Sequence, residues 1–212
     1  MTRDEAVTRM QRSLGFRTGL VTTLRDALVD AQSLLELEAF LPWFLLTEIA
    51  SITTTANEER VPLPSNFLQE FEDGTLYFFD SSAAADEQYT PLAKDDIDFL
   101  RKELPGEGTE PLAYGMDDSY FRLFPTLTAA VTLKIIYYKE DTKLTSNLEN
   151  KWLKYAHDVM RGKAGMEVAG DVRDDKAFAI FQKLHDEGMV RLIRQDEARR
   201  SANRRYVMGG TD

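Results

Sequence analysis

The side chains of this 212-residue chain that could act as general acids or bases include two histidines and several clustered aspartates. His157 and His185 fall in different expected helices, and neither belongs to a His-Glu-x-x-His pair that would bind zinc. We therefore expect both histidines to be surface or partly packed residues. The chain has no cysteine, which excludes zinc–thiolate sites and disulfide bonds.

The aspartates form one cluster at Asp95, Asp96 and Asp98 and a second at Asp117 and Asp118. Two carboxyl groups on either side of a glycosidic bond can act as the acid and base of a glycan hydrolase. A cell-wall glycan hydrolase is therefore one alternative for this chain. Both clusters stand where a helix start and a hairpin turn are expected, however, and local hydrogen bonds explain aspartate at such positions. We predict no catalytic residue, no metal site and no cofactor.

Charge is distributed unevenly in a chain whose net charge is −10. From Asp26 to Asp118 there are 21 acidic residues against four basic ones. Such a surface repels phosphate backbones, which disfavours tight DNA binding. The acidic excess fits either simple solubility or the wall of a channel along which DNA slides without sticking.

The end of the chain has the opposite character. From Arg191 to Arg205 there are six arginines against two acidic residues, and apolar side chains follow. Arginines at a helix end can merely complement the helix dipole. Arginine beside aromatic and apolar groups is also typical of protein interfaces, and we favour that interpretation. A basic-tailed nucleic-acid binder is a further alternative. The candidate partner-binding residues are Arg199, Arg200, Arg204, Arg205, Tyr206, Val207 and Met208.

Hydrophobic periodicity predicts helices at both ends of the chain and strands in the middle. Helices are expected over 3–14, from Thr22 or Thr23 to about residue 39, near 95–104, from a cap at Asn150 to Gly162, and from a cap at Asp171 onward. The apolar side of the last helix is expected to carry Ala177, Phe178, Phe181, Leu184, Met189, Leu192 and Ile193. Gly188 within it indicates close packing or a bend.

Strand-like spacing covers most of residues 48–138. Pro62 and Pro64 cannot donate backbone hydrogen bonds, so they indicate the rim of a sheet. Asp73-Gly74 and Asp117-Asp118 are expected turns, and 130–138 is the best buried strand, with Lys134 at an edge or pointing outward. The fold class is α+β. A helical bundle is formed by 1–40 and 146–202, a β-rich region with one helix is inserted at 41–145, and residues 203–212 form an extended arm.

An ordered set of segments resembles the head-to-tail adaptor (connector) proteins of tailed bacteriophages. The set includes "TRDEAVTRMQRSLGFRTGLVTTLRDALVDAQSLLELE", "LPWFLLTE", "VPLPSNFLQEFEDGTLYFFD", "TLKIIYYKEDTKLTSNLENKWL" and the closing "LIRQDEARRSANRRYVMGG". The resemblance covers almost the whole chain. Two departures, Ala56-Asn57 after the threonine run and Asn66 before Phe-Leu, affect local loop shape.

The resemblance implies a structural virion protein rather than an enzyme. It implies a dodecameric ring below the portal of a phage head, with the helical part facing the portal and the β-rich part facing the next tail or nozzle protein. DNA would pass through the ring without specific binding, and assembly would take place in the host cytoplasm. The first ten residues lack a signal-peptide core, and no apolar run is as long as a membrane span.

Overall fold

The computed structural model describes residues 1–47, 50–71, 75–83 and 88–208, with side chains described up to residue 200. Contacts divide the chain into two compact units. The helical unit comprises Met1–Leu45 and Glu140–Asp212, and the β-rich unit comprises Leu46–Lys139. The chain thus contains helices together with mainly antiparallel sheets, which confirms the α+β class. The portal-facing role of the helical part stays a prediction.

The helical unit contains five α-helices and two short 3₁₀ turns among its described residues. They are α1 (Arg3–Ser13), η1 (Thr18–Leu20), α2 (Val21–Glu36), η2 (Trp43–Leu45), α4 (Lys151–Tyr155), α5 (His157–Asp171) and α6 (Asp175–Met208). Local signals explain several of the starts. Thr2 and Glu5 form a capping box on α1, and the Asn150 side chain accepts a hydrogen bond from the backbone N–H of Leu153 at the start of α4, as predicted.

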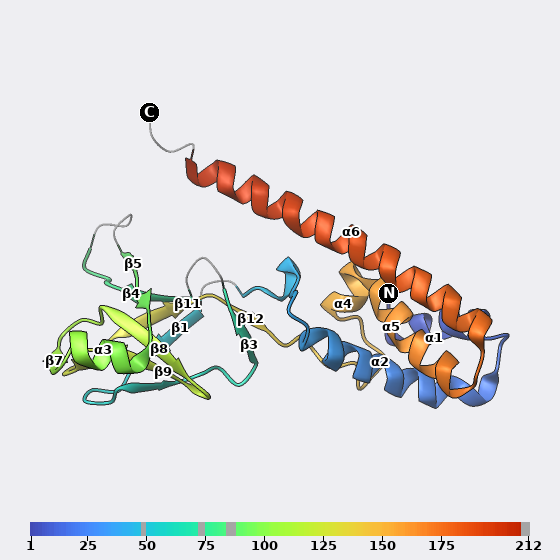
Figure 1. Cartoon of the computed structure of the whole chain (residues 1–212), viewed down its shortest axis with the longest axis horizontal. Helices are drawn as coiled ribbons and strands as arrows, with labels where there is room; N and C mark the ends of the chain where they lie inside the picture. Colours follow the sequence, from blue (N-terminus) through green and yellow to red (C-terminus); the bar gives the residue numbers. More distant parts are fainter. Residues whose placement is uncertain (48–49, 72–74, 84–87, 209–212) are drawn as a thin grey trace. The chain divides into compact units, whose positions relative to one another are not determined.

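Close helix packing joins α5 to α6, the longest helix, which is drawn in orange to red in Figure 1. A Cβ atom placed on Gly162 would lie 2.6 Å from the backbone nitrogen of His185, and one on Gly165 would lie 2.3 Å from the ring of Phe181. Gly188 meets Val159 in the same way at 3.0 Å. The three contacts run in opposite directions along the two helices, so α5 and α6 are antiparallel. The close packing expected at Gly188 is confirmed.

Among its described residues, the β-rich unit is built from two four-stranded sheets, two short strand pairs and one helix. One sheet has the order β1 (Ala50–Thr53), β11 (Thr132–Ile135), β4 (Leu76–Phe79), β5 (Tyr89–Pro91). The other has the order β2 (Arg60–Pro62), β9 (Tyr120–Phe124), β8 (Ala113–Asp117), β6 (Ala93–Lys94). The short pairs are β10 (Thr126–Leu127) with β7 (Glu107–Gly108) and β12 (Tyr137–Lys139) with β3 (Phe67–Glu70). Helix α3 (Ile97–Glu103) packs on β8.

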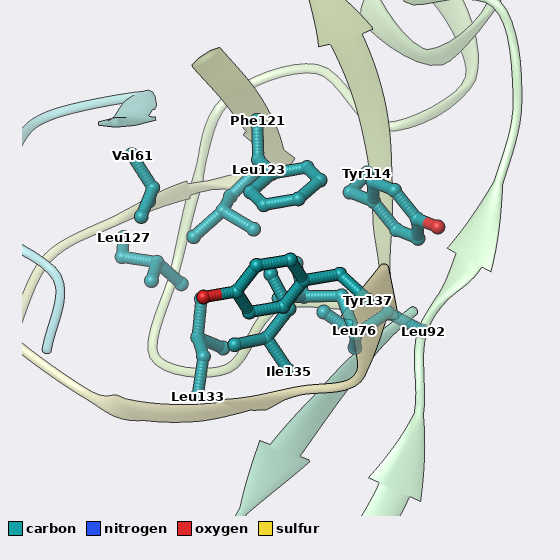
Figure 2. Packing of buried hydrophobic residues seen from close by; sticks show 10 residues of the cluster. All are labelled: Val61, Leu76, Leu92, Tyr114, Phe121, Leu123, Leu127, Leu133, Ile135 and Tyr137. Atoms are coloured by element: carbon teal, nitrogen blue, oxygen red, sulfur yellow. The ribbon is translucent and has the colours of Figure 1, made fainter. Parts of the chain in front are cut away.

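One hydrophobic core holds the two larger sheets together. Leu76, Leu133 and Ile135 come from the first sheet, and Phe121 and Leu123 from the second. Figure 2 shows these side chains pointing toward one another. Each is fully buried, and burial of one such side chain contributes about 1.5–3 kcal/mol. The fully buried residues of β11, Leu133 and Ile135, alternate with partly buried ones because only one side of that strand faces the shared core.

Several local predictions for the β-rich unit are confirmed and one is corrected. The turn after Asp117 joins β8 to β9, and Pro62 lies on the edge strand β2. The expected strand 130–138 is divided at Ile136, because β11 pairs with β1 and β4 whereas β12 pairs with β3. Lys134 lies on an interior strand and not at an edge, but its side chain ends in an exposed hydrogen bond, which agrees with the outward-pointing alternative. Its ammonium group donates to Ser51 Oγ at 2.7 Å. The predicted Asp73-Gly74 turn lies outside the described residues.

Four helix boundaries differ from the prediction. Helix α2 begins at Val21 without a side-chain cap, so Thr22 and Thr23 lie inside it and do not cap it. Helix α5 continues through Gly162 to Asp171, because glycine at this position allows the approach of α6 rather than ending the helix. The last helix is capped by Asp174, which accepts a hydrogen bond from the Ala177 N–H at 3.1 Å, and not by Asp171. Residues 203–208 are helical and not extended. No glycine or proline interrupts the sequence between Gly188 and Gly209, so nothing ends the helix earlier.

Candidate partner-binding site

A buried carboxylate attaches the carboxyl-terminal half of α6 to the rest of the helical unit. Asp196 is 2% exposed. It accepts a hydrogen bond from the backbone N–H of Trp43 at 2.8 Å and another from Arg200 Nε at 2.6 Å. An unpaired carboxylate at this depth would be costly, so the two donors are needed for its burial. Asp196 therefore joins α6 to the η2 segment that precedes the β-rich unit in the sequence.

A cation–π contact strengthens the same attachment. The guanidinium carbon of Arg199 lies 3.5 Å from the centroid of the Trp43 ring. Trp43 in turn packs edge-on against Tyr155 with ring centroids 4.9 Å apart, and Phe44 packs edge-on against Trp152 at 5.1 Å. Contacts of this kind contribute about 0.5–1.5 kcal/mol each beyond the area that they bury. Together they make a firm support for residues 196–200.

The candidate residues are thus divided between two environments. Arg199 and Arg200 contact their own chain through Trp43 and Asp196. Positions 204–208 continue α6 beyond this support, and their side chains lie outside the part of the chain described in atomic detail. A role of these residues in binding a partner stays a prediction. The structure adds that the first two arginines also orient the helix that carries the others.

Exposed apolar side chains precede these residues on α6, and the sequence interpretation missed them. The buried positions Phe181, Gly188 and Leu192 define the inner side of the helix. Val190 and Ile193 lie on the opposite side, where they are 49% and 37% exposed. The expectation that Ile193 faces the core is wrong, as it is for Phe178, which is 39% exposed. A stricter use of the 3.6-residue period would have separated Ile193 from the inner side.

The helical unit also contains a buried polar network, which includes Trp152. Glu36 Oε1 accepts hydrogen bonds from Trp152 Nε1 at 3.0 Å, from Gln32 Nε2 at 3.0 Å and from the Asp141 N–H at 3.2 Å. Asn150 Nδ2 donates to Gln32 Oε1 at 3.1 Å. Burial raises the pKa of Glu36, and these hydrogen bonds only partly oppose the shift. The network connects the end of α2 to the start of α4.

The two aspartate clusters lie beside one shallow hollow of the β-rich unit, which is lined by Lys94, Asp95, Asp96, Ile97, Met116, Asp117 and Asp118. Local hydrogen bonds nevertheless account for two of these acids. Asp96 caps α3 by accepting from the N–H groups of Asp98 and Phe99, and Asp117 pairs with Arg122 at 2.6 Å. The hydrogen bond from Arg122 lowers the pKa of Asp117, whereas a general acid needs a raised pKa.

The histidines lie on different helices, as expected. His157 is beside Asp158 on α5 and His185 is beside Asp186 on α6. Within the described residues, no three His, Cys, Asp or Glu side chains are placed to hold a metal ion. In that same part of the chain, no helix combines the length and the apolar character needed to span a membrane.

Comparison with known proteins gives one family. The family model described as SU10 adaptor protein matches residues 1–207. This range includes both units and all but the last five residues of the chain. No curated protein matches the sequence.

Proposed function

Because the chain belongs to the SU10 adaptor protein family, a family of phage head-to-tail adaptors, we propose that identical copies of it form a ring between the portal and the tail. Membership makes the protein a structural component of the virion that associates with portal and tail proteins. The proposal adds a closed, dodecameric ring that continues the DNA channel and is assembled in the host cytoplasm. The family match over residues 1–207 is the observation that carries it.

The charge distribution supports the channel. The chain carries 36 acidic against 26 basic residues. A wall with acidic excess lets DNA pass without binding it, because both surfaces are negative. DNA therefore passes through the ring as cargo and is not recognised by sequence.

The end of α6 supplies the proposed contact with the portal or with a neighbouring copy. It carries Arg204, Arg205 and Met208 on a helix that Asp196 and Arg199 hold in place. A preordered helix loses less conformational freedom on binding than an extended arm would. Docking of the arginine and apolar groups at the end of α6 therefore costs less conformational entropy.

The test is to mix the purified protein with its cognate portal and to image the product by electron microscopy. We expect a ring of adaptor density on one end of the portal. A variant that ends at residue 202 loses the last turns of α6 and should bind the portal poorly. Normal portal binding by that variant would show that residues 203–212 are not needed for the contact. Failure of the wild-type protein to bind the portal would overturn the proposal.

The alternative functions give different results in simple assays. Turnover of purified peptidoglycan that is lost in Asp96→Asn would indicate a glycan hydrolase instead. Salt-dependent binding of short DNA duplexes by the isolated protein would indicate a nucleic-acid binder.

A further inference from the structure

The first sheet of the β-rich unit has an open edge on each side. In its order β1-β11-β4-β5, strand β1 is one outer strand and β5 is the other (Figure 1). Among the described residues, no strand pairs with the outer side of either one. An outer strand with unpaired backbone groups can pair with a strand of another molecule. The two edges are therefore candidate contact surfaces.

The alternation of backbone hydrogen bonds identifies the groups of β1 that point outward. In an antiparallel pair, residues that bond to the partner strand alternate with residues that bond away from it. The Thr54 N–H donates to the Val131 C=O at 3.0 Å, so Thr54 and Ile52 bond toward β11. Ser51 and Thr53 therefore direct their backbone N–H and C=O groups to the open side. No described residue bonds to these groups within one chain.

The same alternation identifies the outward groups of β5. The Asp80 N–H donates to the Gln88 C=O at 3.1 Å, and the Leu92 N–H donates to a carbonyl of β4 at 3.0 Å. Tyr89 and Pro91 therefore direct their backbone groups away from β4. Because proline has no N–H, this edge offers one donor, from Tyr89, and two carbonyl acceptors. Within the described part of the chain, nothing bonds to them.

The two open edges run in opposite directions. Each neighbouring pair in the order β1-β11-β4-β5 is antiparallel, so β5 is antiparallel to β1. If β5 of one copy lies beside β1 of another copy in the same orientation, the antiparallel order continues across the contact. The second sheet lacks this property. Its outer strands β2 and β6 are parallel to each other, because β6 is parallel to β8.

We propose that β5 of one copy adds to the outer side of β1 of the next copy and that this pairing joins neighbours in the ring. The inference rests on the proposed ring, and it names the strands that form the contact. A contact between two different edges of identical subunits can repeat around an axis and close into a ring. The occupant of each edge is thus a second copy of this chain.

One register matches the open groups of the two edges. With Tyr89 opposite Thr53 and Pro91 opposite Ser51, Tyr89 and Thr53 exchange two hydrogen bonds, and the Ser51 N–H donates to the Pro91 C=O. The Tyr89 and Thr53 side chains then lie opposite each other, and aromatic pairs with β-branched residues stabilise sheets. Neither strand contains a charged residue that would repel its partner. Lys134, the cation beside β1 in the sheet, already donates to Ser51 Oγ at 2.7 Å.

Cysteine crosslinking tests this register, because the natural chain contains no cysteine. In the proposed contact, residues 53 and 89 of neighbouring copies have Cα atoms about 5.5 Å apart, which a disulfide can bridge. Within one chain they are separated by three strand spacings, about 14 Å, which a disulfide cannot bridge. The variant Thr53→Cys/Tyr89→Cys, assembled on the portal and oxidised, should therefore give a ladder of linked oligomers. The ladder should form about tenfold faster than with Thr8→Cys/Tyr89→Cys, which makes the same changes but places one cysteine on α1.

Backbone substitutions test the hydrogen bonds themselves. Thr53→Pro removes an N–H that bonds to no described residue of its own chain, and it should weaken ring formation on the portal about tenfold. Thr53→Ala keeps this N–H and should assemble nearly as well as wild type. Pro91→Ala adds the missing donor opposite the Ser51 C=O and should strengthen assembly severalfold. Circular dichroism of each variant establishes that it is folded, and crosslinking decides the matter if Thr53→Pro is not.

Three outcomes would overturn the inference and leave the proposed function standing. They are normal rings from folded Thr53→Pro, a ladder no faster than in the Thr8→Cys control, and equally fast linkage of the single variant Thr53→Cys to itself. The last result would indicate that two β1 edges meet. Failure of the wild-type protein to assemble on the portal would instead overturn the proposed function.

Discussion

The contact between α5 and α6 allows a sharp prediction at Gly162. Replacing it with alanine places a Cβ atom 2.6 Å from the backbone nitrogen and 2.7 Å from the Cα of His185. Ordinary contact begins at 3.4 Å. The two helices would have to separate by about 0.8 Å, because backbone atoms cannot rotate out of the way as a side chain can. Such a separation would weaken the packing of α5 against α6 along the whole contact.

The size of the effect follows from two opposing contributions. Overpacking of this kind costs about 1–3 kcal/mol, and a collision with backbone belongs at the upper end. Alanine is preferred to glycine inside a helix by about 1 kcal/mol. Gly162→Ala should therefore lower the free energy of unfolding by about 2 kcal/mol. With a urea dependence of about 2 kcal/mol per molar, the midpoint would fall by about 1 M.

A matched control lies in the same helix. A Cβ atom added at Gly170 would meet no other atom within 4 Å, so alanine there keeps the helix preference without a collision. Gly170→Ala should raise the free energy of unfolding by up to about 1 kcal/mol. Urea unfolding followed by tryptophan fluorescence reports on this unit, since Trp43 and Trp152 both belong to it. Equal stability of the two variants would refute the packing argument.

Three further changes test other parts of the helical unit. Asn150→Ala removes the cap on Leu153 and should cost about 1–2 kcal/mol in urea unfolding; a loss below about 0.3 kcal/mol would contradict the capping role. Because burial raises the pKa of Glu36, the folded state binds the proton of this carboxyl group more tightly than the unfolded state does. The contribution of Glu36 to the free energy of unfolding therefore falls as pH rises from about 4.3 through the raised pKa. Glu36→Gln should therefore gain stability relative to wild type over that interval, and a constant difference in Tm between pH 4 and 8 would refute this. Asp196→Ala removes the acceptor of the Trp43 N–H, so hydrogen exchange of α6 amides after residue 192 should become faster, with unchanged protection counting against the anchor.

Local signals account for much of the agreement between sequence and structure. Asn150 caps α4, as expected, because its side chain bonds to an N–H group only three residues away. Pro62 lies at a sheet edge because it lacks a donor wherever it is placed. The turn at Asp117 follows from its neighbours in the same hairpin. Each of these depends on residues close together in the chain.

The candidate site was only partly predictable, because it depends on residues that lie far apart in the chain. Composition located a basic end that we interpret as partner-binding, but the extended arm expected there is helical as far as Met208. The anchoring role of Asp196 depends on Trp43, which lies 153 positions away. The exposure of Leu34 and Leu37 depends on which side of α2 meets α5. No short window of sequence contains such partners.

The amino-acid order by itself determined the class of fold, the positions of most helices and the family to which the chain belongs, because periodicity, caps and motif order are properties of neighbouring residues. Tertiary structure alone decided that Gly162 is a point of close helix contact and not a helix end. It also decided that Ile193 is exposed and that the 130–138 strand changes partners at Ile136. Burial and pairing are set by the element that packs opposite, and that element comes from a distant part of the chain.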